Sequence, residues 1–140
     1  MSTAWEKFEE LVKEKMRENF SETVIEHAMD PKNLGNLDEY DGFADYTGPC
    51  GDTMQIWLKV KDGSIDNATF MTDGCGTSVA SADMITELAK GKSIDEASKI
   101  DQQQVLDALG GLPEDSEHCA LLAERTLKQA LDNYHEKKSQ

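Results

Sequence analysis

Apolar residues at every second position in the middle of the chain constrain the fold more than any other feature of the sequence. They run from Met54 to Val60, and this alternation predicts a strand with one buried face. Turn residues at 61–64 predict that a second strand over 65–72 returns antiparallel to the first. A further short strand is predicted at 42–46. The centre of the chain should therefore form a small sheet built on a hairpin.

Helical periodicity replaces the alternation on both sides of this hairpin. Apolar residues spaced three or four apart predict an amphipathic helix over 3–19. Its apolar face would carry Trp5, Phe8, Val12 and Met16. Further helices are predicted after the capping residues Ser21, Ser93, Asp101 and Ser116, and directly after Gly74-Cys75-Gly76. A helix, then a sheet, then several helices is the order of an α+β fold rather than a doubly wound one.

Length and charge limit the classes of function. A chain of 140 residues suits one domain, and its net charge of −14 would repel phosphate backbones, which argues against nucleic-acid partners. No apolar run approaches the roughly 20 residues of a membrane span, so no membrane partner is expected. The first residues are acidic and lack the apolar centre of a secretory signal, which predicts a cytoplasmic protein.

Three cysteines are the candidate functional residues, and each stands in a glycine-rich loop or near a predicted helix start. Cys50 precedes Gly51-Asp52, Cys75 lies between two glycines, and Cys119 follows His118. Structural disulfides are unexpected in a cytoplasmic protein, so free thiols in these settings favour a metal or redox role. Taken alone, each cysteine could simply be a small buried side chain. The setting that all three share favours one assembled site that also contains Asp52 and His118.

The predicted helix starts carry an electrostatic expectation. Main-chain N–H groups at a helix N-terminus stabilise a thiolate, which predicts a lowered pKa for both Cys75 and Cys119. Adjacent residues on a helix point about 100° apart, so His118 and Cys119 would reach different sides of a site or serve as alternative ligands. The remaining histidines, His27 and His135, are predicted to be surface groups because charged residues surround them.

The motifs around the three cysteines resemble those of the IscU/NifU N-terminal family. The likeness covers roughly residues 22–137 and is carried by the segments Cys50-Gly51-Asp52, Gly74-Cys75-Gly76-Thr77-Ser78-Val79-Ala80-Ser81 and His118-Cys119-Ala120-Leu121-Leu122-Ala123-Glu124. The resemblance implies an α+β domain over 22–138 with a three-stranded antiparallel sheet and packed helices. Residues 1–21 would be an N-terminal helical extension that covers the domain, mediates a homodimer or docks a partner.

The family's role implies a scaffold for iron–sulfur cluster assembly rather than an enzyme. Such a scaffold receives sulfur as persulfide from a cysteine desulfurase, binds ferrous iron, builds a [2Fe–2S] cluster and passes it to apo-proteins. By this resemblance the cluster and metal ligands would be Cys50, Asp52, Cys75, His118 and Cys119. Cys119 would accept the first sulfur, and Asp52 would keep the cluster labile. A site with Cys and His ligands also suits Zn²⁺, so zinc is an alternative occupant of the isolated protein.

The sequence departs from the family before the His-Cys pair. Bacterial members carry Leu-Pro-Pro-Val-Lys there, which a specialised chaperone grips, whereas this chain has Leu112-Pro113-Glu114-Asp115-Ser116. The resemblance therefore does not extend to the chaperone contact. Two other functions stay open: a zinc-binding sulfur acceptor that forms no cluster, and an enzyme in which Cys119 is the nucleophile and His118 the base. The second is disfavoured because adjacent residues rarely face each other.

Overall fold

The computed structural model describes residues 3–138, apart from the side chains of Lys13 and Met16, so the predicted place of Met16 on an apolar face lies outside the described part. The strands are β1 (Gly42–Thr47), β2 (Thr53–Lys61) and β3 (Ser64–Thr72). The helices are α1 (Ala4–Arg17), α2 (Glu22–Met29), α3 (Gly76–Ala89), α4 (Ile94–Ser98), α5 (Gln102–Leu109) and α6 (Glu117–Lys138), and a 3₁₀ turn (Glu114–Ser116) leads into α6. The predicted α+β class is confirmed.

The three strands form one antiparallel sheet in the order β1-β2-β3. The turn between β2 and β3 uses positive φ at Asp62 (54°) and Gly63 (78°), a backbone that matches the twist of a tight hairpin. Along β2, Met54, Ile56 and Leu58 are completely buried, as the alternation in the sequence predicts. The sheet thus has one face that must be covered by other elements.

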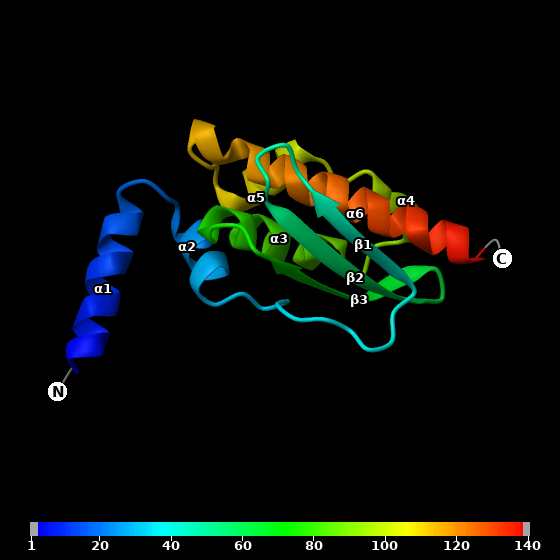
Figure 1. Ribbon diagram of the computed structural model, residues 1–140, viewed down its shortest axis with the longest axis horizontal. Coiled ribbons are helices and arrows are strands. Elements are labelled where there is room, and N and C mark those ends of the chain that lie inside the picture. The colour runs from blue at the N-terminus through cyan, green and yellow to red at the C-terminus, as the bar shows by residue number, and fades with distance from the viewer. Residues whose placement is uncertain (1–2, 139–140) are drawn as a thin grey trace.

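Helices cover that face (Figure 1). Helix α6 packs on β1 and β2, α3 packs on β3, and the two helices also contact each other. The layer between them and the sheet is the core, where Phe70, Ile85 and Leu127 are fully buried. Because α3 and α6 both begin at the end of the sheet where the β1–β2 loop lies, their first residues and this loop are brought together.

A buried polar network joins α2, α3 and the coil that follows α2. The Asp83 carboxylate, completely buried on α3, lies 2.5 Å from Nδ1 of His27 and accepts the Asn33 backbone N–H at 2.8 Å. Asn33 in turn donates its side-chain amide to the Thr86 hydroxyl at 3.0 Å. His27 is therefore not the surface group that the sequence predicted, because its partner lies 56 residues away and local context does not reveal it. His135 is exposed, as expected.

The same coil continues along the outer edge of β3. The Phe70 N–H donates to the Asn33 carbonyl at 3.0 Å, and the Gly35 N–H donates to the Phe70 carbonyl at 2.8 Å. These bonds pair backbone groups of an edge strand that would otherwise be open to another chain. The network around Asp83 thus fixes a segment that protects the sheet.

Helix α1 stands apart from the rest of the molecule (Figure 1), and its main contact is with α2. Three of its large apolar residues stay in solvent, since Trp5 is 65% exposed, Phe8 56% and Leu11 58%, whereas Val12 is half-buried. Of the three roles open to this helix, covering the domain is therefore not what the structure shows. No helix among residues 3–138 combines the length and apolar composition needed to cross a bilayer.

Candidate metal centre

The loop between β1 and β2 presents the first two candidate ligands. It is closed by hydrogen bonds from the Gly48 N–H to the Asp52 carbonyl (2.9 Å) and from the Gly51 N–H to the Gly48 carbonyl (3.0 Å). Gly51 has φ of +94°, a conformation that favours glycine. This tight turn leaves Cys50 exposed and Asp52 half-buried at the end of the sheet.

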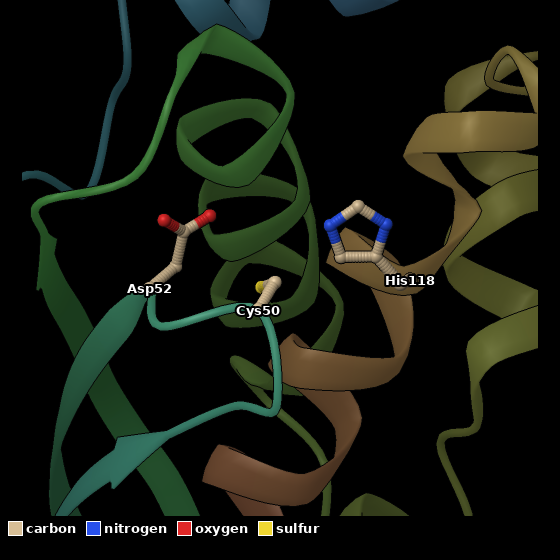
Figure 2. A group of neighbouring side chains, drawn as sticks. All are labelled: Cys50, Asp52 and His118. Atoms are coloured by element: carbon tan, nitrogen blue, oxygen red, sulfur yellow. The ribbon is translucent and has the colours of Figure 1, made fainter.

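Cys50, Asp52 and His118 form a compact group of three different donors. One ligand atom from each lies within 4.8 Å of the others. Figure 2 shows Cys50 and Asp52 on their loop with His118 facing them from the start of α6. Ligands bound about 2.0–2.3 Å from one ion are separated by distances of this order, so the three donors could share a single metal.

Cys75 occupies the N-cap position of α3, as predicted, and is exposed. Its sulfur lies 3.0 Å from the Thr77 hydroxyl. This hydroxyl is the largest influence that lowers the pKa of the Cys75 thiol, and the main-chain N–H groups of Ser78 and Thr77 add to it against the opposing effect of burial. The predicted direction of the pKa shift is confirmed, although a side chain contributes more than the helix backbone.

Cys119 is the third residue of α6 and is almost completely buried, with 1% of its surface exposed. Burial raises the pKa of its thiol, and hydrogen bonds from Ser78 and Thr77 offset this only in part. The predicted lowering of this pKa is therefore wrong, because loss of solvent outweighs the field of the helix start. Ser116 belongs to the 3₁₀ turn that runs straight into α6, so it is not the cap that the sequence predicted.

Two hydroxyl groups that sequence reasoning missed, those of Thr77 and Ser78, connect three of the five candidate residues. Thr77 Oγ1 lies 3.3 Å from the sulfur of Cys119 as well as close to Cys75. The Ser78 hydroxyl lies 3.4 Å from both Asp52 Oδ2 and Cys119 Sγ, and its one hydrogen can be donated to either. The sequence did contain a signal for these contacts, because two hydroxyl residues stand in the first turn of the helix that Cys75 begins.

Gly74 makes this close arrangement possible. A Cβ at this position would lie 2.5 Å from Oγ of Ser78 and 3.2 Å from Oδ2 of Asp52. His118 completes the group, since its Nε2 lies 3.8 Å from the sulfur of Cys119, so the two neighbours meet although the sequence favoured different sides of the site. All five predicted residues therefore gather at one end of the molecule.

The donor set favours soft or borderline metals. Thiolates select zinc, copper(I) and iron–sulfur centres, imidazole suits zinc and iron, and a carboxylate is a harder and weaker ligand for such ions. Two of the thiols are exposed and one is buried, so the site is open on one side. Such an arrangement can hold a metal while leaving a coordination position for a partner.

Comparison with the sequences of known proteins decides the family of this chain. The NifU-like N-terminal domain matches residues 19–140. The chain belongs to this family. Its relatives include the iron–sulfur cluster assembly scaffold protein IscU of Haemophilus influenzae, 44% identical over 123 residues, with 84% of this chain and 97% of that protein covered. IscU 1 of Archaeoglobus fulgidus is 43% identical over 119 residues, with coverages of 84% and 78%.

A solved structure supports the fold of this family member. The N-terminal part of a NifU-like protein from Brucella abortus superposes with a TM-score of 0.65 at 20% identity and covers 84% of this chain and 94% of that one. At this level of identity the likeness concerns the arrangement of helices and strands. It agrees with the three-stranded antiparallel sheet and packed helices that the motifs implied.

Proposed function

We propose that this protein is a scaffold on which an iron–sulfur cluster is assembled and from which it is released. The observation that carries the proposal is the gathering of three thiols, one carboxylate and one imidazole at one partly open end of the molecule. Membership of a family whose relatives are named as scaffold proteins supports it.

The cargo would be a [2Fe–2S] cluster held by thiolates of Cys50, Cys75 and Cys119, with Asp52 or His118 as the weaker ligand. Four thiolates would retain a cluster firmly, because cluster iron prefers sulfur ligands. An oxygen or nitrogen donor in one position weakens the hold and leaves room for exchange. Asp52 is half-buried beside Cys50, which is a suitable place for a ligand that must leave.

Sulfur would arrive as a persulfide from a cysteine desulfurase, with Cys119 as the first acceptor. The Cys119 thiolate attacks the outer sulfur, a new S–S bond forms on Cys119, and the desulfurase thiolate leaves, so no external oxidant is needed. The raised pKa of the Cys119 thiol means that a proton must first be removed. Nε2 of His118, 3.8 Å from Cys119 Sγ, is near enough to accept it after a small shift.

The further partners follow from the same role. The cluster would pass to apo iron–sulfur proteins in the cytoplasm, where free thiols persist. A homodimer that bridges one cluster between two copies is compatible with the open side of the site. Residues 1–21 would serve as an extension to the domain over 22–138.

Anaerobic reconstitution with ferrous iron and sulfide tests this proposal. We expect about two irons and two sulfides per site, with a coloured chromophore that Cys75→Ala removes. Asp52→Ala should lengthen the lifetime of the cluster under chelator challenge, while Asp66→Ala, which changes an exposed carboxylate on β3, should leave it unchanged. A cluster that decays faster in Asp52→Ala would contradict the role given to Asp52.

The group of Cys50, Asp52 and His118 favours one alternative function. Sulfur, oxygen and nitrogen donors within 4.8 Å of one another suit tetrahedral Zn²⁺. The protein would then be a zinc-binding sulfur acceptor that forms no cluster. One zinc per chain that persists under reconstitution, with iron refused, would establish this alternative.

A further inference from the structure

A cavity of about 360 Å³ opens beside the candidate metal centre, along the first two turns of α6. Its walls are mainly apolar and come from Pro49, Leu121 and Leu122. Cys50 and His118 also line it, so the cavity is continuous with the metal centre. Its volume lies near the lower end of the roughly 300–1,000 Å³ typical of small-molecule sites.

Arg125 supplies a positive charge to this apolar cavity. It lies on α6 seven residues after His118, two turns further along the same face and about 10 Å along the helix axis. Long side chains on a helix extend toward its N-terminus, which brings a guanidinium at this position back toward His118. Arg125 is therefore placed to bind an anionic group within the cavity.

The guanidinium has no carboxylate partner among the described residues. Its recorded contact is a long hydrogen bond of 3.4 Å from Nη1 to the hydroxyl of Tyr46, which also lines the cavity. Neighbouring Glu124 is occupied elsewhere, since it accepts the Gln102 N–H at 2.8 Å and pairs with Lys128 at 3.5 Å. In a chain of net charge −14 an uncompensated arginine beside a thiol site is a distinctive feature.

The two parts of the cavity differ in what they can bind. Near Cys50 and His118 the Asp52 carboxylate repels an anion, but a metal held there accepts a sulfur ligand. Near Arg125 an anion is favoured. A ligand that satisfies both parts has a sulfur at one end, a carboxylate at the other and a short apolar body between them.

We propose that this cavity binds a low-molecular-mass thiol that carries a carboxylate, with its sulfur on the metal held at Cys50 and His118 and its carboxylate paired with Arg125. The inference rests on the proposed function, because the sulfur end needs a thiophilic metal. Such a thiol fills the coordination position on the open side of the site. It would hold that position until a protein ligand replaces it.

Cobalt(II) is the probe for this site, because a thiolate that joins tetrahedral cobalt changes its visible and near-ultraviolet absorption. The cobalt-loaded protein is titrated without oxygen with 3-mercaptopropionate, with 2-mercaptoethanol and with propionate. We expect 3-mercaptopropionate to act at up to about fivefold lower concentration than 2-mercaptoethanol, as one ion pair to the exposed Arg125 side chain would give. Propionate should act only at far higher concentration, and equal potency of propionate would overturn the requirement for sulfur.

Arg125→Gln carries the decisive comparison. It should reduce the preference for 3-mercaptopropionate to less than about twofold while leaving 2-mercaptoethanol unaffected. Lys128→Gln is the matched control, because it removes the same charge one turn away, outside the cavity, and should keep the preference of the unaltered protein. Comparing variants with the same pair of thiols cancels the intrinsic difference between the thiols. An unchanged preference in Arg125→Gln would overturn the proposal.

A second measurement separates failure of this inference from failure of the proposed function. Protein that takes up no cobalt would contradict the metal centre itself. The metal-free protein is therefore also titrated with 3-mercaptopropionate and followed by amide NMR. We expect shifts at 46–50 and 121–125 that are absent in Arg125→Gln, and their absence in the unaltered protein would overturn the anion site.

Discussion

At the scale of single residues, the Thr77 hydroxyl sets the character of two thiols. It lies 3.0 Å from the sulfur of Cys75 and 3.3 Å from that of Cys119. The same donor acts on an exposed thiol and on a buried one, so the pKa of Cys75 is lowered while that of Cys119 stays raised. The two cysteines are therefore chemically unlike although they belong to one site.

The order of thiol reactivity in the metal-free protein follows from these pKa directions. The thiolate is the form that reacts, and a lowered pKa makes it available at lower pH. We expect alkylation of Cys75 by iodoacetamide to become fast below the pH at which an ordinary cysteine reacts, and that of Cys119 only above it. Mass spectrometry of protein treated across a pH series measures both.

Thr77→Val is the matched variant for this prediction, since valine keeps the shape of threonine without its hydroxyl. It should move the pKa of Cys75 upward and leave Cys119 at least as resistant as before. Equal alkylation profiles for the two cysteines in the unaltered protein would contradict the assigned environments.

Sequence reasoning named five candidate residues that the structure brings together, and it predicted the direction of the pKa shift for Cys75 but not for Cys119. The ligand types and their glycine-flanked settings are local, so Cys50, Asp52 and Cys75 can be found from the chain alone. The raised pKa of Cys119 depends on how completely other elements cover it. The contacts of Ser78 with Asp52 and Cys119 likewise appear only when three segments meet.

At the scale of elements, the buried Asp83 carboxylate joins α2, α3 and the coil that borders β3. It receives His27 from one segment and the Asn33 N–H from another. A carboxylate that is completely buried requires such partners, because an unpaired charge in the interior is costly. His27 and the Asn33 N–H therefore need Asp83 as their buried hydrogen-bond partner, and the Asp83 carboxylate needs them.

Asp83→Ala should destabilise the fold by about 3 kcal/mol, because it leaves His27 and the Asn33 N–H without their partner. Urea unfolding followed by circular dichroism measures this. Asp95→Ala is the control, since Asp95 on α4 is 81% exposed in its ion pair with Lys99 and should cost less than about 1 kcal/mol. Similar losses of unfolding free energy in the two variants would show that the buried network stabilises the fold no more than an exposed ion pair does.

Three of the four predicted caps were predictable because they are made within a few residues, whereas Ser116 lies in the 3₁₀ turn and is not a cap. Ser21 accepts the Val24 N–H at the start of α2, and both Ser93 and Asp101 form the capping boxes that their sequences indicate. The pair of His27 and Asp83 spans 56 positions and leaves no local pattern. Contacts between residues close together in the chain can thus be predicted from the sequence, whereas contacts between distant segments cannot.

At the scale of the whole molecule, the two tryptophans report on two different parts. Trp57 lies in the sheet and is 9% exposed, whereas Trp5 on α1 is 65% exposed and contacts Phe8 with ring centroids 5.8 Å apart. Helix α1 thus offers an apolar surface that the domain does not use. The solvent accessibility of Trp5 therefore reports whether another molecule covers this surface.

Single-tryptophan variants test this arrangement. In Trp57→Phe the fluorescence of the remaining Trp5 should be quenched by acrylamide almost as readily as that of free tryptophan. In Trp5→Phe the remaining Trp57 should be protected several-fold, because burial limits its collisions with the quencher. Protection of Trp5 that grows with protein concentration would indicate that α1 associates with a second copy.

The three cysteine-bearing segments lie 25 and 44 residues apart in the chain and meet only at one end of the fold. A cargo bound to all three would act as a removable cross-link, closing two long loops at once. Loading would then raise the melting temperature and slow hydrogen exchange at this end, because ligands that bind the folded state stabilise it. Release of the cargo would remove the constraint on the same segments. For this protein, delivery and local loosening would be a single event.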